Sequence, residues 1–205
     1  MATCFLVMGT PRSGTSAVAG ILHHLGIPMG ERIDDPNNPD RWDFSDPNEW
    51  NPRGHFQDAA FGNLEDVEFG PHLPPSKDWV PSERFRTTLR TLIEARCLSG
   101  YWGLKSNRLP FYIDLFTSLW GQEIKTIVTK REKARSLVSW HARGGAEEGK
   151  VLIDTNFTPP NNSLIIEFDS LFDATEETVS RIAAFVGRPL TEKALFHVIP
   201  ELRRF

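Results

Sequence analysis

Eight residues near the start of the chain combine small, hydroxyl and cationic side chains in a spacing that suits anion binding. They are Gly9-Thr10-Pro11-Arg12-Ser13-Gly14-Thr15-Ser16. An apolar run from Cys4 to Met8 precedes them, and an amphipathic segment follows to about Leu25, which predicts a strand, a tight loop and a helix. In such a unit the loop amides and the positive end of the helix dipole converge on one point. The pattern therefore predicts a site for a phosphate or sulfate group.

The loop has the G-x-x-x-x-G spacing of a Walker A motif, but Thr15-Ser16 follows it in place of Lys-Ser or Lys-Thr. The lysine of the nucleotide triphosphatases is therefore absent. Arg12 puts a cation inside the loop instead, where a guanidinium can reach a terminal anionic group from the side, and the nearby hydroxyls can add donors. The alternative is an ordinary strand-to-helix turn whose glycines serve only geometry.

The segment Pro11-Arg12-Ser13-Gly14-Thr15-Ser16 resembles the 5′-phosphosulfate loop of sulfotransferases that depend on PAPS, 3′-phosphoadenosine 5′-phosphosulfate. The resemblance implies an α/β, P-loop NTPase-like three-layer fold with a central, mostly parallel sheet. It also implies PAPS binding by these six residues and transfer of a sulfuryl group to an acceptor hydroxyl or amine. The acceptor would be a small molecule or a glycan.

A second segment, Asn51-Pro52-Arg53-Gly54-His55-Phe56-Gln57-Asp58, is similar to Asn-Pro-Lys-Gly-Tyr-Phe-Glu of the bacterial and phage-like branch. Gln57 stands where that branch has a glutamate, Asp58 supplies a carboxylate one position later, and His55 replaces the aromatic residue. Glu31 is a third candidate, because some branches place a glutamate base soon after the first helix. We rank the candidate general bases as His55, then Asp58, then Glu31.

Tyr101 to Lys105 has the pattern of a short strand that ends in a lysine. A lysine at the carboxyl end of a strand in an α/β sheet points into the ligand crevice. The family resemblance gives Lys105 a contact with the sulfate and its bridging oxygen, so Lys105 joins Arg12 and His55 as a catalytic candidate. Asn107 stands where the cytosolic steroid and phenol branch has a catalytic histidine, and that histidine does not carry over.

Glu123 to Lys130 is a β-branched run typical of a buried strand. Arg131 follows it directly, and Ser139 comes eight positions later on a predicted helix. Two turns of helix bring a hydroxyl back toward the end of the strand. In the family that the sequence resembles, an arginine and a serine with this spacing bind the 3′-phosphate of PAPS. The alternative is that Arg131 only caps or pairs at the surface.

Further elements complete the expected α/β order. Strands are predicted near residues 3 to 8, 101 to 105, 124 to 130 and 163 to 168, and helices over 81 to 98, 111 to 120 and 175 to 186. We expect the arginines of the helix over 81 to 98 to form a solvated face. The segments 34 to 81 and 144 to 162 are interpreted as loops that line the acceptor pocket.

Composition limits the other possibilities. With 205 residues, 40% of them hydrophobic and 24% charged, the chain is expected to form one domain over 1 to 205. A net charge of −4 argues against nucleic acid or anionic membranes as partners. No stretch approaches the ~18 apolar residues of a membrane span, so we expect a cytoplasmic protein. Cys4 and Cys97 are interpreted as reduced thiols, and no metal site is predicted.

Two other functions fit parts of the pattern. A P-loop kinase of a small metabolite would use the same loop, although it would need a lysine at Thr15. A nucleotide-binding relative without turnover is suggested by Gln57 and Asn107, which occupy positions where branches of the family keep acid–base groups.

Overall fold

A parallel four-stranded sheet forms the centre of the computed structural model, which describes residues 2–29, 58–70, 74–76, 78–96, 100–142, 150–192 and 195. The strands are β1 (Thr3–Gly9), β2 (Tyr101–Lys105), β3 (Glu123–Lys130) and β4 (Leu164–Glu167). Their order is β2-β1-β3-β4, and each neighbouring pair is parallel. The sheet therefore needs a crossover connection between every pair of strands.

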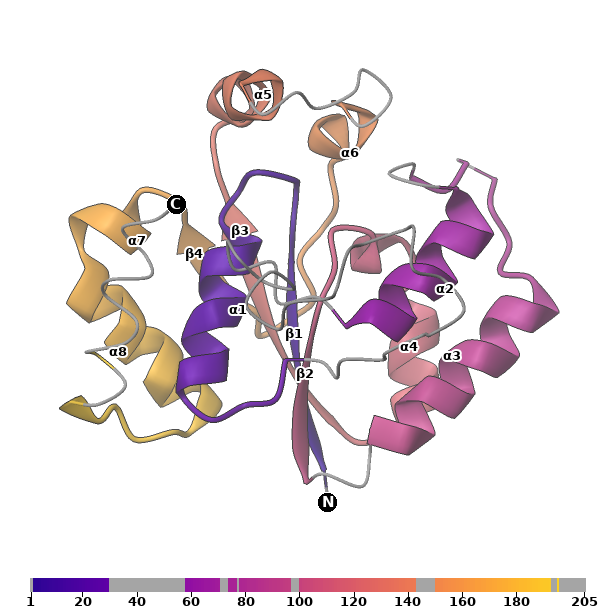
Figure 1. Ribbon diagram of the computed structural model, residues 1–205, viewed down its shortest axis with the longest axis horizontal. Coiled ribbons are helices and arrows are strands. Elements are labelled where there is room, and N and C mark those ends of the chain that lie inside the picture. Colours follow the sequence, from indigo (N-terminus) through magenta and orange to yellow (C-terminus); the bar gives the residue numbers. More distant parts are fainter. Residues whose placement is uncertain are drawn as a thin grey trace, which may run out of the picture.

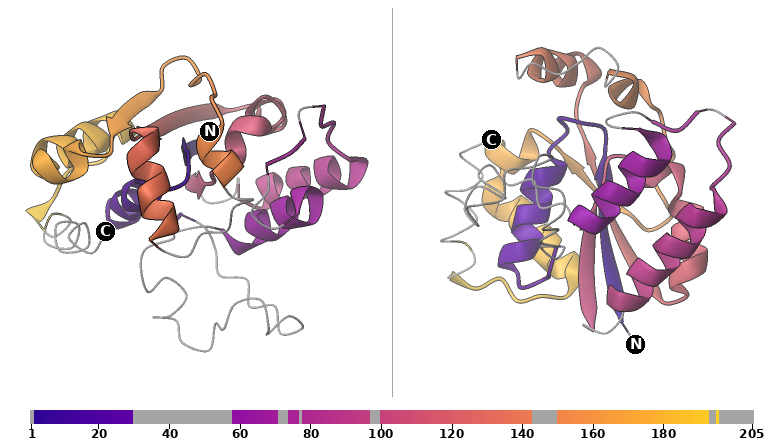
Figure 2. Two further views of the ribbon diagram at one scale, coloured as in Figure 1. Left: turned by 90° about the horizontal axis from the view of Figure 1, so that it is seen from above. Right: turned by 45° about the vertical axis from the view of Figure 1, so that its right-hand side comes forward.

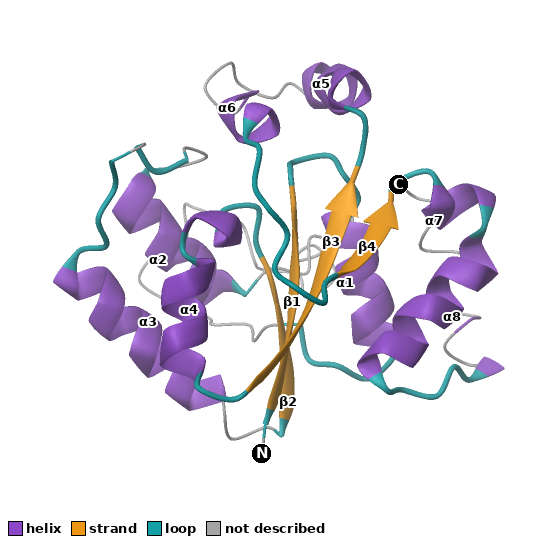
Figure 3. Cartoon of the chain, turned by 180° about the vertical axis from the view of Figure 1, so that it is seen from behind, coloured by secondary structure: helices purple, strands orange, loops and turns teal. Residues whose placement is uncertain are grey.

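Helices cover both faces of this sheet (Figure 1). One face carries α1 (Thr15–His24), α7 (Ser170–Asp173) and α8 (Thr175–Val186). The other carries α2 (Ala59–Phe69), α3 (Glu83–Arg96) and α4 (Ile113–Trp120), with the 3-10 turn η2 (Leu109–Phe111) ahead of α4. Two more helices, α5 (Lys133–His141) and α6 (Lys150–Asp154), lie beyond the carboxyl ends of the strands (Figures 2 and 3).

The central strand β1 is buried on both sides, which explains its uninterrupted apolar sequence. Phe5 and Val7 pack with α1 and α8, whereas Leu6 and Met8 pack with α2, α3 and α4. Successive side chains of a strand point to opposite faces, so one apolar run supplies two cores. The second core is rich in aromatic rings, with Trp102 of β2 stacked on Phe116 of α4 at a centroid distance of 6.1 Å.

The strand order creates a switch point between β1 and β3. From β1 the chain continues to β2 on one side, and from β3 it continues to β4 on the other side. Ligands of open α/β sheets bind in the crevice outside the carboxyl ends of strands at such a point. The loop after β1 and the segment after β3 both lie there.

The α/β class and all four predicted strands are confirmed, and the helix over 175 to 186 has the predicted bounds. Two interpretations as loop were wrong, because α2 lies within 34 to 81 and α6 within 144 to 162. Both helices bury apolar side chains, including Phe61 and Leu64 of α2. Arg96 also departs from the expected solvated face, because it is buried.

Candidate functional site

The loop between β1 and α1 is held against β3 by its own side chains. The Ser13 hydroxyl is fully buried and donates to the carbonyl oxygen of Thr10 at 2.6 Å. It also shares a hydrogen bond of 2.7 Å with the hydroxyl of Thr129 on β3. A Cβ atom at Gly9 would lie 2.3 Å from the Thr129 Oγ1 atom, so only glycine allows this approach. Ser13 therefore fixes the shape of the loop. The sequence predicted for it only a contact with the ligand.

The first turn of α1 presents its backbone N–H groups without a side-chain cap. Gly14 occupies the N-cap position with φ 97°, and its residue type offers no capping oxygen. Arg12 also has a left-handed backbone, with φ 68°, which is uncommon for a residue other than glycine. Strained backbone of this kind gathers at ligand sites. Together with the helix dipole, the uncapped turn makes this end of α1 suitable for an anion.

The side chains predicted to contact opposite ends of one ligand meet at this loop. Arg12 donates from Nε to the Ser139 Oγ atom at 3.1 Å, although 127 positions separate them. Arg131 donates from Nη1 to the carbonyl oxygen of Arg12 at 3.1 Å. The Arg131 guanidinium also stacks on the ring of Phe168, 3.8 Å from its centroid. The structure thus brings together Arg12, Arg131 and Ser139.

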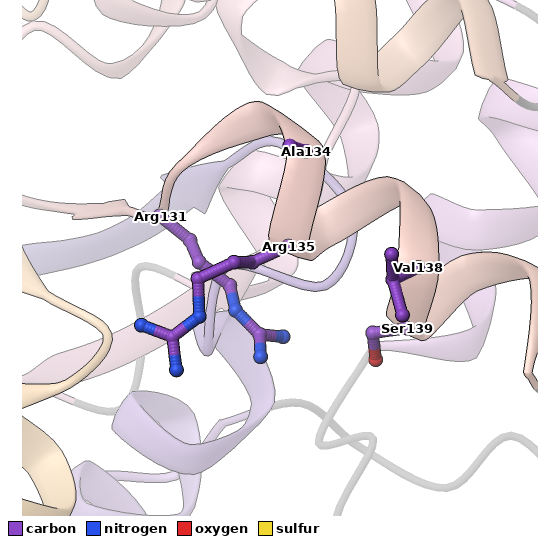
Figure 4. Close-up of a pocket in the computed structure, with 5 residues that line it drawn as sticks. All are labelled: Arg131, Ala134, Arg135, Val138 and Ser139. Atoms are coloured by element: carbon purple, nitrogen blue, oxygen red, sulfur yellow. The ribbon is translucent and has the colours of Figure 1, made fainter.

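A hollow of about 280 Å³ opens beside these residues along α5 (Figure 4). Its walls are formed by two guanidinium groups, one hydroxyl and aliphatic side chains, from Arg131, Ala134, Arg135, Val138 and Ser139. Burial, followed by the charge of Arg135, lowers the pKa of Arg131, and the nearby Asp169 opposes this shift. Two adjacent arginines above an apolar surface favour an anion that carries a flat apolar group.

Two polar atoms between the end of β3 and the middle of α5 are buried without a hydrogen-bond partner within the described part of the chain. They are the Nε atom of Arg131 and the Oγ atom of Ser136. A buried donor that lacks an acceptor costs roughly 1–3 kcal/mol. Arg131 also lines the hollow, and a buried donor in such a place is typical of a site whose acceptor comes from a ligand.

Lys105 ends β2 beside the loop, since its backbone is in register with Val7 of β1. Only 3% of the side chain is exposed. Burial lowers the pKa of the Lys105 amine from 10.5 to about 8, the positive charge of Arg12 acts in the same direction, and the carboxylate of Glu65 opposes both. Close by, Thr15 of α1 donates to the Asn107 Oδ1 atom at 3.4 Å. The segment after β2 therefore lies against the loop after β1.

Of the three candidate bases, His55 and Glu31 lie outside the described residues, and their roles stay predictions. Asp58 is fully buried and caps α2, accepting from the amide of Ala60 at 3.0 Å. Its other oxygen accepts from Arg96 Nη2 at 2.8 Å and Nε at 3.1 Å. These contacts give Asp58 a structural function in joining the start of α2 to the end of α3.

Sequence reasoning did not single out a buried polar cluster behind Lys105. Glu65, Ser106, Arg108 and Tyr112 are all at least nine-tenths buried. Glu65 lies on α2, within a segment whose sequence pattern predicts a loop, so its contact with the segment after β2 was not predictable. The signals available were Asp58 as a helix N-cap and the apolar residues Phe61 and Leu64 that follow it.

The described residues contain no group of three or more His, Cys, Asp or Glu side chains that could hold a metal ion. None of the helices that the structure describes is long and apolar enough to cross a membrane.

A parallel sheet with a glycine-bounded loop at its switch point defines the P-loop NTPase-like class of α/β fold. No protein-family model matches the chain, and no curated protein matches its sequence. The sulfotransferase domain of the olefin synthase from Synechococcus PCC 7002 has a similar structure. Its TM-score is 0.52 at 15% sequence identity, and the match covers 96% of this chain and 77% of that chain. This likeness shows that the two proteins share a fold.

Two weaker likenesses come from other solved structures. A sugar kinase from Janibacter sp. HTCC2649 gives a TM-score of 0.49 at 14% identity, over 92% of this chain and 96% of that chain. Retinol dehydratase, solved with androsterone and the inactive cofactor PAP, gives 0.46 at 15% identity, over 98% of this chain and 64% of that chain.

Proposed function

We propose that the protein is a sulfotransferase that transfers a sulfuryl group from PAPS to a hydroxyl or amine of an acceptor. One observation carries this proposal. Three cations lie at the carboxyl ends of three neighbouring strands: Arg12 is in the loop between β1 and the uncapped start of α1, Lys105 ends β2, and Arg131 directly follows β3. Arg12 also contacts Ser139, which supports a site in which the loop and α5 bind one anionic ligand together.

PAPS carries anionic groups at two ends, and we assign donors of the site to each. The loop amides, Arg12 and the hydroxyls of Thr15 and Ser16 would hold the 5′-phosphosulfate. Arg131 and Ser139 would hold the 3′-phosphate. The buried Arg131 Nε atom supports this assignment, because it has no acceptor among the described residues and a phosphate oxygen would supply one.

In the reaction, the bond between sulfur and the bridging phosphate oxygen of PAPS breaks, and a bond forms between sulfur and the acceptor atom. The leaving phosphate oxygen gains negative charge, which Arg12 and Lys105 would neutralise. This is the combination of positioning and electrostatic stabilisation that serves phosphoryl transfer. The acceptor gives its proton to a base, for which His55 remains our first candidate, ahead of Asp58 and Glu31.

The kinase alternative has less support at the loop itself. Thr15 occupies the position of the Walker lysine, is buried, and bonds to Asn107. An ammonium group that would reach a transferred phosphate is therefore missing at this position.

Thermal unfolding with added ligands tests the proposal. We expect adenosine 3′,5′-bisphosphate to raise Tm in proportion to the logarithm of its concentration, and adenosine 5′-phosphate to raise it far less. Stabilisation by Mg·ATP alone would contradict the proposal and favour the kinase. PAPS consumption with a panel of hydroxyl and amine acceptors then separates enzyme from binding protein, because binding without turnover on any acceptor would favour the non-catalytic alternative.

A further inference from the structure

Behind Lys105, helix α2 places the carboxylate of Glu65 inside the protein. Its side chain is 2% exposed, and its Oε1 atom accepts hydrogen bonds from the Ser106 hydroxyl at 2.5 Å and the Tyr112 hydroxyl at 2.6 Å. Ser106 is the residue directly after Lys105. Burial and the adjacent carboxylate raise the pKa of Tyr112 well above its usual value, so its hydroxyl remains the donor. The mechanism above uses none of these three groups.

The cluster fixes the segment that carries Lys105 at its start. The Ser106 Oγ atom accepts from the Arg108 amide at 3.0 Å, and the Arg108 guanidinium bonds to Asp66 of α2 and to the carbonyl oxygen of Gly70, each at 2.7 Å. The Ser106 amide bonds to the Val7 carbonyl of β1 at 3.2 Å. Helix α2 therefore sets where β2 ends relative to the loop after β1.

Two charged side chains shift the pKa of Lys105 in opposite directions. Glu65 of α2 is the carboxylate that favours the protonated amine, while Arg12 of the loop after β1 disfavours it. Burial raises the pKa of Glu65, and the negative charge of Asp66 adds to this rise. The hydrogen bonds from Ser106 and Tyr112 and the charge of Arg108 oppose it. A buried ammonium group is retained only with a compensating charge.

We propose that Glu65 is a positioning residue, which keeps the Lys105 amine charged and in place next to the anion loop. The part of this proposal that concerns the reaction rests on the proposed function, but the charge of Lys105 can be measured without any ligand. The experiments can therefore contradict the role of Glu65 and the sulfotransferase function independently of each other.

The first test follows the Lys105 amine in the unliganded protein by NMR with lysine labelled with ¹³C at Cε, assigned with Lys105→Arg. We expect the wild-type amine to titrate near pH 8 and the Glu65→Gln variant to titrate lower by about one pH unit, because an opposite charge at close range shifts a pKa by this order. Glutamine keeps an acceptor for Ser106 and Tyr112. Glu94→Gln removes an exposed carboxylate of α3 and should leave the Lys105 titration unchanged.

An unchanged Lys105 titration in folded Glu65→Gln would overturn the proposal. Should that variant not fold, the wild-type protein still decides. The Lys105 resonance must then show a second inflection at acidic pH as Glu65 takes up its proton, and the absence of this inflection would equally overturn it.

The second test measures kcat against pH. In Glu65→Gln the alkaline limb should move to lower pH by the same amount as the NMR titration. For a shift of about one pH unit, the rate at pH 8 should fall about fivefold, because the protonated fraction of Lys105 falls from about one half to about one tenth. Glu65→Asp keeps the charge and should keep the limb, whereas a uniform loss at every pH in both variants would indicate a merely structural residue. If NMR shows the shift and no PAPS turnover exists, the proposed function fails and the charge coupling stands.

Discussion

Lys105 meets two opposing demands, because a charged amine is useful next to a transferred sulfuryl group and costly inside a folded protein. The side chain is 3% exposed, and burial lowers its pKa from 10.5 to about 8. The unfolded chain therefore holds this proton over a pH range in which the folded protein has released it. Folding becomes more favourable as pH rises from 8 to 10.5, because the unfolded state binds more protons there.

Lys105→Met should accordingly stabilise the unliganded protein and inactivate it. Below pH 8 we expect an increase in the free energy of unfolding of about 3 kcal/mol, which shrinks as pH approaches 10.5. Urea unfolding at a series of pH values measures this. The kcat should fall by about 100-fold or more, the scale of losing one oxyanion donor. Lys130→Met, at the exposed end of β3, is the control that should show neither effect. A stability gain of Lys105→Met that does not depend on pH would refute the electrostatic cause.

Arg131 and Ser139 are assigned to the 3′-phosphate, and their substitution should discriminate between two nucleotides. Arg131→Ala and Ser139→Ala should each weaken adenosine 3′,5′-bisphosphate by about 10- to 100-fold, because a charged hydrogen-bond partner is lost. Binding of adenosine 5′-phosphate should change much less. Isothermal titration calorimetry measures both affinities, with the exposed Arg84→Ala on α3 as the control. Equal losses for the two nucleotides would contradict the assignment.

At the scale of elements, α2 is the helix on which the proposed role of Glu65 depends, and a buried ion pair fixes its N-cap residue. Asp58 and Arg96 are 0% and 7% exposed and lie 2.8 Å apart. Asp58 also caps the helix through the amides of Ala60 and Phe61. The end of α3 thus holds the start of α2, and α2 in turn carries Glu65 to the back of Lys105.

Asp58→Asn should destabilise the protein by about 3–5 kcal/mol, because it leaves the Arg96 charge buried without its partner. Asparagine remains a good N-cap, so the loss reports the charge. Chemical denaturation provides the measurement. Asp154→Asn, which breaks the exposed pair with Lys133, should change stability by less than about 1 kcal/mol. An unchanged unfolding free energy with a large loss of kcat would instead identify Asp58 as the general base.

At the scale of the whole molecule, the site joins segments that are far apart in the sequence. The loop after β1 and helix α5 are linked by the contacts from Arg12 to Ser139 and from Arg131 to Arg12. A ligand that contacts both the loop and α5 should suppress the local unfolding of both segments, because it binds only when they are folded.

Hydrogen exchange can test this coupling. Adenosine 3′,5′-bisphosphate should slow amide exchange by several-fold in residues 10–16 and in 133–141 at the same ligand concentration. The amides of α3, which lies on the side of the sheet away from α1 (Figure 1), should exchange at an unchanged rate and serve as the internal reference. Protection of the loop without protection of α5 would separate the two halves of the proposed site.

The order of the elements and the location of the anion loop were predictable from the sequence, because local patterns dictate them. Uninterrupted apolar runs such as Cys4 to Met8 are buried on both faces, and Gly14 can adopt a left-handed backbone at the start of a helix. The strand ends after Lys105 and before Arg131 followed from the same patterns. Parallel strands have their carboxyl ends at one edge of the sheet, so it was also predictable that Lys105 and Arg131 would lie near the anion loop.

Only the tertiary structure decided which polar side chains are buried and what they face. The helix α2 has a short apolar stripe interrupted by Gly62 and Asn63, so its pattern was too weak to distinguish it from a loop. Asp58 and Arg96 are separated by 38 positions and Glu65 and Ser106 by 41, and no local pattern reports such pairings. Their contacts depend on how α2 and α3 pack on the sheet, because a charged group enters a core only where packing supplies its partner.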